Sequence, residues 1–386
     1  MSIALTGTAI TSPPAEALAL AALVRDCVAS GAGRRVLHLR LSALPDALRE
    51  PHRRRLVEET LAPVMRPTRA RRFELPGGDL VIVSPPPGQY LDEVHEALNR
   101  LLPETPDGPL SVRLRLPAEG ARLMAVVESA LGLVLREDPE AAAPALPVPE
   151  AAALDAALRS LATADIASSI RSQPIWRLAP GQAAPLPLWT ETRVHLPDLL
   201  DSLLPGTSLA GSPALARRFR RAAERRLLAE LARPEVARDL PPACLPLALG
   251  SLTEAEALRL DAALGPGGRS RLVVCVPLGD VLADPAGAAL AARLARERGW
   301  TLGLDAPSPW LLARVDLRGL APGLIRLRFA ADWLAGKAAE RAALDAALPE
   351  DRARVVLRGA DAPVAVAWAW QRGITAFTGK VLDARR

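Results

Sequence analysis

The sequence predicts an α/β chain of two domains, in which a smaller α+β domain precedes a larger one of alternating strands and helices. The chain has 386 residues, and roughly 100–200 residues make up an ordinary domain. Half of its residues are hydrophobic, which is enough to fill sizeable cores. The pattern of apolar residues also changes after a proline-rich segment at 136–150, so the two halves are expected to differ in fold.

The N-terminal half shows the element order of a ferredoxin-like domain. Helices are predicted from apolar spacing of three and four, strands from alternation, and a hairpin from the turn residues Pro76-Gly77-Gly78-Asp79. The expected elements are a helix over 14–30, a strand over 35–42, a helix over 51–65, a hairpin over 70–85, a helix over 91–102, a strand over 111–116 and a helix over 121–131. Within them, the order strand, helix, hairpin, helix, strand is that of a split βαβ sheet.

An interdomain linker is expected at residues 136–150. This segment holds four prolines among alanines and acidic residues, a composition that suits no packed element. The sequence therefore predicts one domain over 1–135, the linker over 136–150 and a second domain over 151–386.

The C-terminal half alternates helices with short apolar strands. The expected helices cover 151–163, 213–233, 253–264, 285–298, 337–348 and 361–372, and the expected strands cover 245–249, 272–277, 301–304, 324–327, 355–357 and 376–377. Several of these strands are continuously apolar, as strands buried on both faces are. The pattern therefore predicts a parallel α/β barrel or a doubly wound sheet.

Charge and aromatic content argue against a nucleic-acid partner. The formal net charge is +5, but the densest arginine runs, at 53–55 and 217–226, have helical spacing and indicate solvated helix faces. Aromatic residues make up 3% of the chain, and none interleave with these runs, so no platform for stacking bases is expected.

The cysteines and the N-terminus indicate a cytoplasmic protein. Cys27, Cys244 and Cys275 are far apart in sequence and have neither zinc-site spacing nor a disulfide framework, so each is expected to be a small buried side chain. The four histidines are isolated from each other and from the cysteines, and a structural or surface role is expected for each. No signal peptide is evident, and the longest apolar stretch near the start, at 15–24, is too short to span a bilayer.

Short motifs in the second half occur in the order found in a known family. The motifs are QPIWRL at 173–178, LGLD at 302–305, GLIRL at 323–327, VLRGAD at 356–361 and RGITAFTG at 372–379. Over residues 165–386 the chain thus resembles an EAL domain, the fold of cyclic di-GMP phosphodiesterases. The resemblance implies a TIM-like α/β barrel, and it also implies a homodimer.

The first half resembles, more faintly, a GGDEF nucleotide-cyclase domain. Residues 72–80 read RFELPGGDL, where that family has its Gly-Gly-Asp hairpin. The alternative of an unrelated ferredoxin-like domain stays open, because Gly-Gly-Asp is also ordinary turn chemistry. Leu80 stands where the resemblance implies an acidic metal ligand, so cyclase activity is not expected.

The resemblance to EAL domains implies two divalent cations held by strand-end oxygen ligands, and most of those ligands are missing here. Asp305 is retained, whereas Glu191 reaches the position of the first glutamate only with a four-residue shift. The other aligned positions are occupied by Ala248, Cys275, Arg326, Arg328, Arg358 and Thr378. Hard cations need several oxygen ligands, so neither a metal cofactor nor hydrolysis is expected.

The preferred hypothesis is therefore a non-catalytic signalling scaffold that acts through a protein partner. One alternative is a metal-independent cyclic di-GMP receptor, because arginines at a barrel mouth can bind phosphate. Another is a residual phosphodiesterase that uses Glu191 and Asp305. The candidate ligand-binding residues are Gln173, Glu191, Asp305, Arg326 and Arg358, although Gln173 is also expected to make structural hydrogen bonds at the bottom of the barrel.

Overall fold

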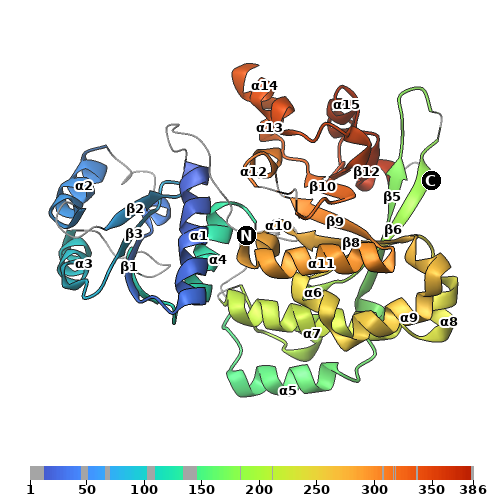
Figure 1. Cartoon of the computed structure of the whole chain (residues 1–386), viewed down its shortest axis with the longest axis horizontal. Helices are drawn as coiled ribbons and strands as arrows, with labels where there is room; N and C mark the ends of the chain where they lie inside the picture. Colours follow the sequence, from blue (N-terminus) through green and yellow to red (C-terminus); the bar gives the residue numbers. More distant parts are fainter. Residues whose placement is uncertain are drawn as a thin grey trace. The chain divides into compact units, whose positions relative to one another are not determined.

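The computed structural model shows two compact units that separate near residue 134, and each is described by itself (Figure 1). The structure describes residues 13–44, 51–65, 70–101, 109–133, 146–182, 184–210, 212–306, 308–315, 317, 319–335 and 338–383.

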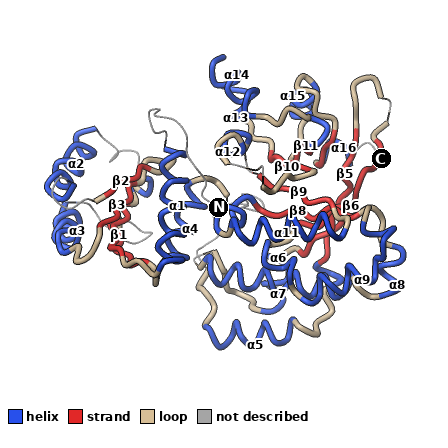
Figure 2. Tube along the Cα trace, viewed as in Figure 1, coloured by secondary structure: helices blue, strands red, loops and turns tan. Residues whose placement is uncertain are grey.

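The N-terminal unit is built on a four-stranded antiparallel sheet with the strand order β2-β3-β1-β4 (Figure 2). Its elements are α1 (Pro13–Ser30), β1 (Arg34–Leu39), α2 (Pro51–Met65), β2 (Arg71–Glu74), β3 (Leu80–Ser84), α3 (Gln89–Leu101), β4 (Ser111–Leu116) and α4 (Gly120–Ala130). This order confirms the ferredoxin-like pattern.

One core cluster of this unit lies between the sheet and the helices α2 and α3, and α1 and α4 cover the other face of the sheet (Figure 1). Leu37 and Leu39 of β1 and Ile82 of β3 pack against Val57 of α2 and Leu98 of α3. Every residue of β3 is buried, which fits its position in the interior of the sheet between β2 and β1.

The C-terminal unit is a closed barrel of eight strands in the order β10-β11-β12-β5-β6-β7-β8-β9. The strands are β5 (Ile170–Arg177), β6 (Leu186–Val194), β7 (Ala243–Pro246), β8 (Leu272–Pro277), β9 (Thr301–Ala306), β10 (Leu324–Arg328), β11 (Val355–Arg358) and β12 (Ala376–Thr378). The helices are α5 (Ala151–Leu161), α6 (Leu196–Leu203), α7 (Pro213–Leu231), α8 (Pro234–Asp239), α9 (Ala255–Arg269), α10 (Leu278–Ala283), α11 (Pro285–Arg298), α12 (Pro309–Leu312), α13 (Asp332–Ala335), α14 (Ala338–Ala347), α15 (Pro363–Trp370) and α16 (Lys380–Asp383).

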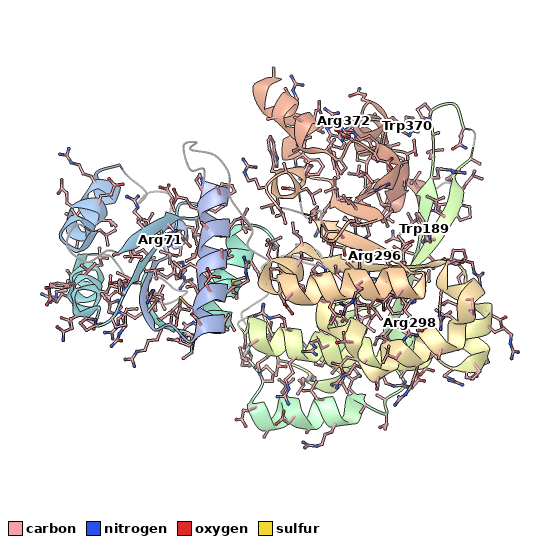
Figure 3. The ribbon with its side chains drawn as sticks, in the orientation of Figure 1. Arg71, Trp189, Arg296, Arg298, Trp370 and Arg372 are labelled. Atoms are coloured by element: carbon pink, nitrogen blue, oxygen red, sulfur yellow. The ribbon has the colours of Figure 1, made fainter. Side chains whose placement is uncertain are left out.

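The barrel confirms the expected fold class and excludes the doubly wound sheet, but one strand runs against the others. β5 is antiparallel to both β6 and β12, while the remaining neighbours are parallel. The Nε1 atom of Trp370, labelled in Figure 3, donates a hydrogen bond of 2.7 Å to the carbonyl of Leu178 and so joins α15 to the end of β5.

Several elements differ from the sequence-based expectation, and neither β5 nor β6 was among the strands expected from apolar runs. β6 was not expected as a strand, because Pro187 interrupts its first half and its buried residues begin only at Glu191. The strand expected over 245–249 ends at Pro246, and a 3-10 helix follows over Leu249–Thr253. The helix expected to end at 264 continues to Arg269 across a kink at Gly265, whose positive φ of 61° suits glycine.

The last residues of the expected linker pack with the barrel unit. The backbone N–H of Ser208 donates to the carbonyl of Pro147 at 2.9 Å, four residues before α5 begins. Residues 134–145 lie outside the described residues, so the proposed linker boundaries stay a prediction. Among the helices that the structure describes, none combines the length and the apolar character that crossing a bilayer requires.

Candidate functional site

Four of the five candidate residues come from strands that end at the same mouth of the barrel. Glu191 lies on β6, Asp305 on β9, Arg326 on β10 and Arg358 on β11. Parallel pairing places Arg326 beside Asp305 in register. Side chains two residues apart on a strand share a face, so Arg326 and Arg358 point inward like Leu324 and Val356 of the apolar layer below them.

Arg326 forms ion pairs with two carboxylates at once. Its Nη2 lies 2.9 Å from Oε2 of Glu191, and its Nε lies 2.9 Å from Oδ1 of Asp305. All three side chains are almost completely buried. A guanidinium carries several N–H donors in a fixed plane, so a single arginine can span two acids that a lysine ammonium would meet only as a point charge.

The charges in this cluster shift the pKa values of Glu191 and Arg326 in opposite directions. Burial raises the pKa of Glu191, but the neighbouring charges of Arg326, Arg358 and Arg193 outweigh it and leave that pKa below its ordinary value. Burial likewise lowers the pKa of Arg326, and the charges of Asp305 and Glu191 raise it well above the usual arginine range. Glu191 and Arg326 are therefore both held in their charged forms at neutral pH.

Arg358 stands at the outer side of this cluster. Its Nη2 lies 3.9 Å from Oε1 of Glu191, and its Nη1 lies 3.9 Å from Oδ2 of Asp305. Its side chain is 23% exposed, unlike that of Arg326, which is fully enclosed. Arg358 therefore has N–H donors near the carboxylates and part of its surface in solvent.

Two cysteines that are far apart in sequence meet inside the barrel. The Sγ atoms of Cys244 on β7 and Cys275 on β8 are 3.6 Å apart, and both are free thiols. Nη1 of Arg326 lies 3.3 Å from Sγ of Cys244. A hydrogen bond from Cys275 lowers the pKa of Cys244, whereas burial raises that of Cys275 well above its ordinary value. The positions of Cys244 and Cys275 in the sequence did not predict this contact, because the pairing register of the barrel strands brings the two residues together.

Gln173 does not lie at the bottom of the barrel, which corrects the sequence-based expectation. It is on β5, directly opposite Glu191 in an antiparallel register. Because β5 runs against the other strands, Gln173 is near the mouth, while Ile175 belongs to the apolar layer beneath. Gln173 is half-buried and adjoins the charged cluster.

The position aligned with a metal-binding asparagine, Ala248, contributes only its backbone. Its N–H donates to Oε2 of Glu224 on α7 at 2.9 Å, and the hydroxyl of Ser251 donates to the same oxygen at 2.7 Å. Glu224 also pairs with Arg220 at 2.6 Å. This buried glutamate, which was not predicted from the sequence, holds the segment after β7 in place.

The residues present do not fit the pair of divalent cations that the resemblance implies. Both inward carboxylates already face guanidinium groups, and the other aligned positions are alanine, cysteine, arginine and threonine. Among the residues that the structure describes, no group of three or more acidic, histidine or cysteine side chains is arranged to hold a metal ion. Glu191 and Asp305 are brought together as the residual-phosphodiesterase hypothesis requires, but Arg326 lies between them.

In the N-terminal unit, Asp79 of the Gly-Gly-Asp hairpin connects the hairpin to β1 and the residues after it. Its Oδ1 accepts a hydrogen bond of 2.7 Å from the backbone N–H of Ser42, and its Oδ2 lies 3.3 Å from Nε2 of His38. Gly77 and Gly78 have φ of 95° and 91°, a conformation that favours glycine. Leu80 is fully buried in β3, so the hairpin offers an apolar side chain at the position aligned with an acidic ligand.

Comparison with known proteins gives matches among solved structures only. No protein-family model and no curated protein matches the chain. The apo S helix-GGDEF-EAL structure of LapD from Vibrio cholerae matches with a TM-score of 0.46 at 11% identity, covering 96% of this chain and 93% of that one. BlrP1 of Klebsiella pneumoniae, with manganese and cyclic di-GMP, matches with a TM-score of 0.39 at 14% identity, covering 90% and 94%.

The FimX EAL domain of Xanthomonas citri, in complex with cyclic di-GMP, matches with a TM-score of 0.39 at 14% identity, covering 58% of this chain and 90% of that one. The matched structures thus include the GGDEF and EAL domains that the sequence resembles. Identities this low transfer no residue role, and the function is therefore proposed from this chain's own side chains.

Proposed function

We propose that this chain is a non-catalytic protein of cyclic di-GMP signalling, located in the cytoplasm, which acts through contacts with a protein partner. The observation that supports this most is that the buried guanidinium of Arg326 forms ion pairs with both Glu191 and Asp305. A fixed cation at this position neutralises the carboxylates that a metal-dependent hydrolase would need. A homodimer and the absence of a nucleic-acid partner stay predictions.

Electrostatics and acid–base chemistry both disfavour hydrolysis at this mouth. Two-metal phosphodiester hydrolysis needs oxygen ligands that clamp both ions and an activated water. A metal ion entering between Glu191 and Asp305 would have to displace Arg326 and would meet Arg358 at close range. Arg326 is also a poor proton shuttle, because its raised pKa keeps it protonated.

The test of this proposal is a hydrolysis assay of the purified full chain with cyclic di-GMP and an excess of Mg²⁺ or Mn²⁺. We expect no linear dinucleotide product by chromatography, and no heat of Mn²⁺ binding by titration calorimetry. Metal-dependent formation of the linear product that is lost in Asp305→Asn would overturn the proposal and support the residual-phosphodiesterase alternative.

A second candidate function is a metal-independent cyclic di-GMP receptor. The observation that favours it is Arg358, whose partly exposed guanidinium is not tightly paired with either carboxylate. Guanidinium groups bind phosphate oxygens in pairs and stack on bases, so this side chain is suited to a dinucleotide. The charge of Arg193 beside Glu191 adds to the positive field at the same mouth.

This candidate is tested by titrating cyclic di-GMP into the protein in the presence of a chelator. Receptor function predicts saturable binding that Arg358→Ala weakens by about tenfold or more, which corresponds to about 1.4 kcal/mol. Arg296→Ala, at an exposed arginine near the end of α11 (Figure 3), is the control and should bind as the wild type does. Absence of binding at millimolar ligand would remove the receptor candidate and leave the scaffold proposal standing.

A further inference from the structure

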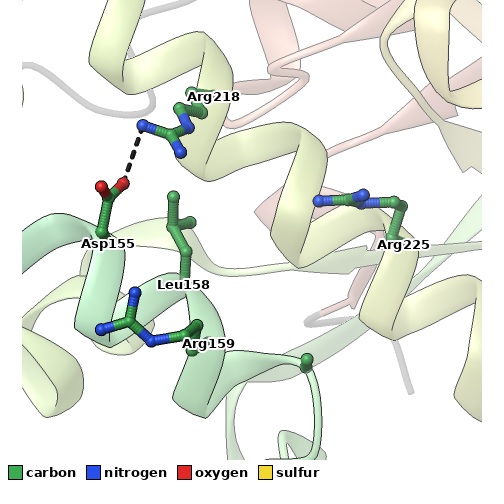
Figure 4. A pocket seen from close by; sticks show the side chains of 6 residues that line it. Asp155, Leu158, Arg159, Arg218 and Arg225 are labelled. Atoms are coloured by element: carbon green, nitrogen blue, oxygen red, sulfur yellow. Dashed lines mark ion pairs between the residues drawn. The ribbon is translucent and has the colours of Figure 1, made fainter.

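A hollow on the surface of the barrel unit lies between α5 and α7 (Figure 4). Its volume is about 390 Å³, and it is lined by Asp155, Leu158, Arg159, Ala162, Arg218 and Arg225. Figure 4 shows the side chains of Arg159, Arg218 and Arg225 around this hollow, with Leu158 between the two helices. We refer to these six residues as the α5–α7 groove.

The helical repeat explains why these residues share one surface. Asp155, Leu158 and Ala162 are separated by three and four positions, so they follow one face of α5 and its C-terminal end. Arg218 and Arg225 are seven positions apart and therefore face the same way, two turns from each other along α7. Leu154, Ala157 and Leu161 of α5 are buried beneath, and they hold the helix in place.

The groove carries a local excess of positive charge. Nη1 of Arg218 lies 2.9 Å from Oδ1 of Asp155, a pair that orients Arg218 toward α5. Neither Arg159 nor Arg225 has an ion pair with an acidic side chain in the described part of the chain, and both are exposed. Three guanidinium groups therefore surround a single carboxylate, beside the apolar surface of Leu158 and Ala162.

This composition distinguishes between classes of anionic partner. No aromatic side chain lines the groove, so it lacks the stacking surface that single-stranded nucleic acids use. The groove spans residues 155–162 of α5, which is about 10 Å along a helix axis and matches about two turns of a docked helix. Apolar side chains flanked by arginines suit a segment that presents both carboxylate and apolar side chains.

We propose that the α5–α7 groove is a docking site for an acidic, partly apolar peptide segment of a protein partner. The proposal deepens the scaffold function and rests on it, because it names the chemistry of the partner and the surface that meets it. Acidic side chains of the partner would pair with Arg159 and Arg225 and share the remaining donors of Arg218, while its apolar side chains would cover Leu158 and Ala162.

The test uses the full chain and a fluorescent 12-residue helical peptide in which glutamate and leucine alternate at helical spacing, with binding measured by fluorescence anisotropy. The variant is the double charge reversal Arg159→Glu/Arg225→Glu. The matched control is Arg293→Glu/Arg296→Glu on α11, which changes the net charge equally at two other exposed arginines. Circular dichroism verifies that each variant is folded.

We expect the groove variant to bind the peptide about tenfold or more weakly than the wild type, as loss of several surface charge pairs predicts. The control should bind within about twofold of the wild type. Equal weakening in both variants would overturn the proposal, because it would show attraction to net charge alone. Full displacement of the peptide by an equimolar single-stranded oligonucleotide would also overturn it, in favour of a nucleic-acid surface.

These outcomes are separate from those of the proposed function. Hydrolysis of cyclic di-GMP would remove the non-catalytic assignment without changing peptide binding at α5 and α7. Conversely, failure of the peptide to bind would remove the docking site and leave the chemistry of the barrel mouth unaffected.

Discussion

Nε of Arg326 lies 2.9 Å from Oδ1 of Asp305, on two neighbouring parallel strands whose register places the two residues side by side. The same guanidinium reaches Glu191 across the barrel. A buried arginine is tolerated only when acids compensate its charge, so the three residues act as one structural unit. The carboxylates at this mouth thus stabilise a buried guanidinium group.

Removing the charge of Arg326 should destabilise the barrel strongly. Arg326→Met removes the nearest cationic partner of the buried Glu191 and Asp305 carboxylates, and losing one member of a buried pair costs about 3–5 kcal/mol. Urea denaturation followed by circular dichroism measures this change. Arg358→Met is the control and should cost less than about 1 kcal/mol, since its pairs are longer and partly exposed. Equal losses of unfolding free energy in the two variants would contradict the conclusion that the buried ion pairs of Arg326 stabilise the barrel.

Truncating Arg326 should also allow Mn²⁺ to stabilise the protein. Arg326→Ala opens space between two buried carboxylates, and carboxylate oxygens are ligands that such ions accept. Millimolar Mn²⁺ should raise the melting temperature of Arg326→Ala by a few degrees, since about 1 kcal/mol moves it by about 2–4 °C. The wild type should not respond. A response in the wild type of similar size would show that its carboxylates already accept metal.

Glu191 should contribute a stability that is lost in acid. Its folded-state pKa lies below the ordinary glutamate value, because the charges of Arg326, Arg358 and Arg193 outweigh its burial. A carboxyl with a depressed folded pKa stabilises the fold above its unfolded pKa of about 4.3, and this contribution disappears as the pH falls through the folded value. Glu191→Gln should therefore show a smaller loss of stability between pH 5 and acid than the wild type in denaturant titrations. A steeper loss in the variant would contradict the assignment.

Asp79 should matter for the stability of the N-terminal unit. Burial raises its pKa, but hydrogen bonds with His38 and Ser42 hold it below the ordinary aspartate value. Asp79→Ala removes the acceptor for the N–H of Ser42 and the partner of His38, and we expect a loss of about 1–3 kcal/mol. Hydrogen exchange of β1 and β3 measures it. Glu59→Ala is a control that should have little effect, because the carboxylate of Glu59 pairs with the exposed Arg55.

Much of the fold could be predicted because its signals are local. The run from Leu80 to Ser84 is apolar and β-branched, and Gly77-Gly78 turns the chain before it, so the hairpin was evident from the sequence. The barrel strands β8, β9 and β10 were likewise marked by short apolar runs. β6 was not predicted, because its proline-interrupted start lacks such a run. Its pairing with β5 and β7 defines it as a strand.

The sequence alone predicted two domains that each combine helices and strands, and it placed Asp305, Arg326 and Arg358 on, or directly after, short apolar strands of the second domain. Only the tertiary structure decided that Arg326 pairs with both Glu191 and Asp305, that Cys244 and Cys275 touch, and that Gln173 lies near the mouth. Helix and strand formation follow from periodicities within a few residues. Ion pairs and thiol contacts across the barrel depend on strand order, direction and register, which closure of the whole sheet sets.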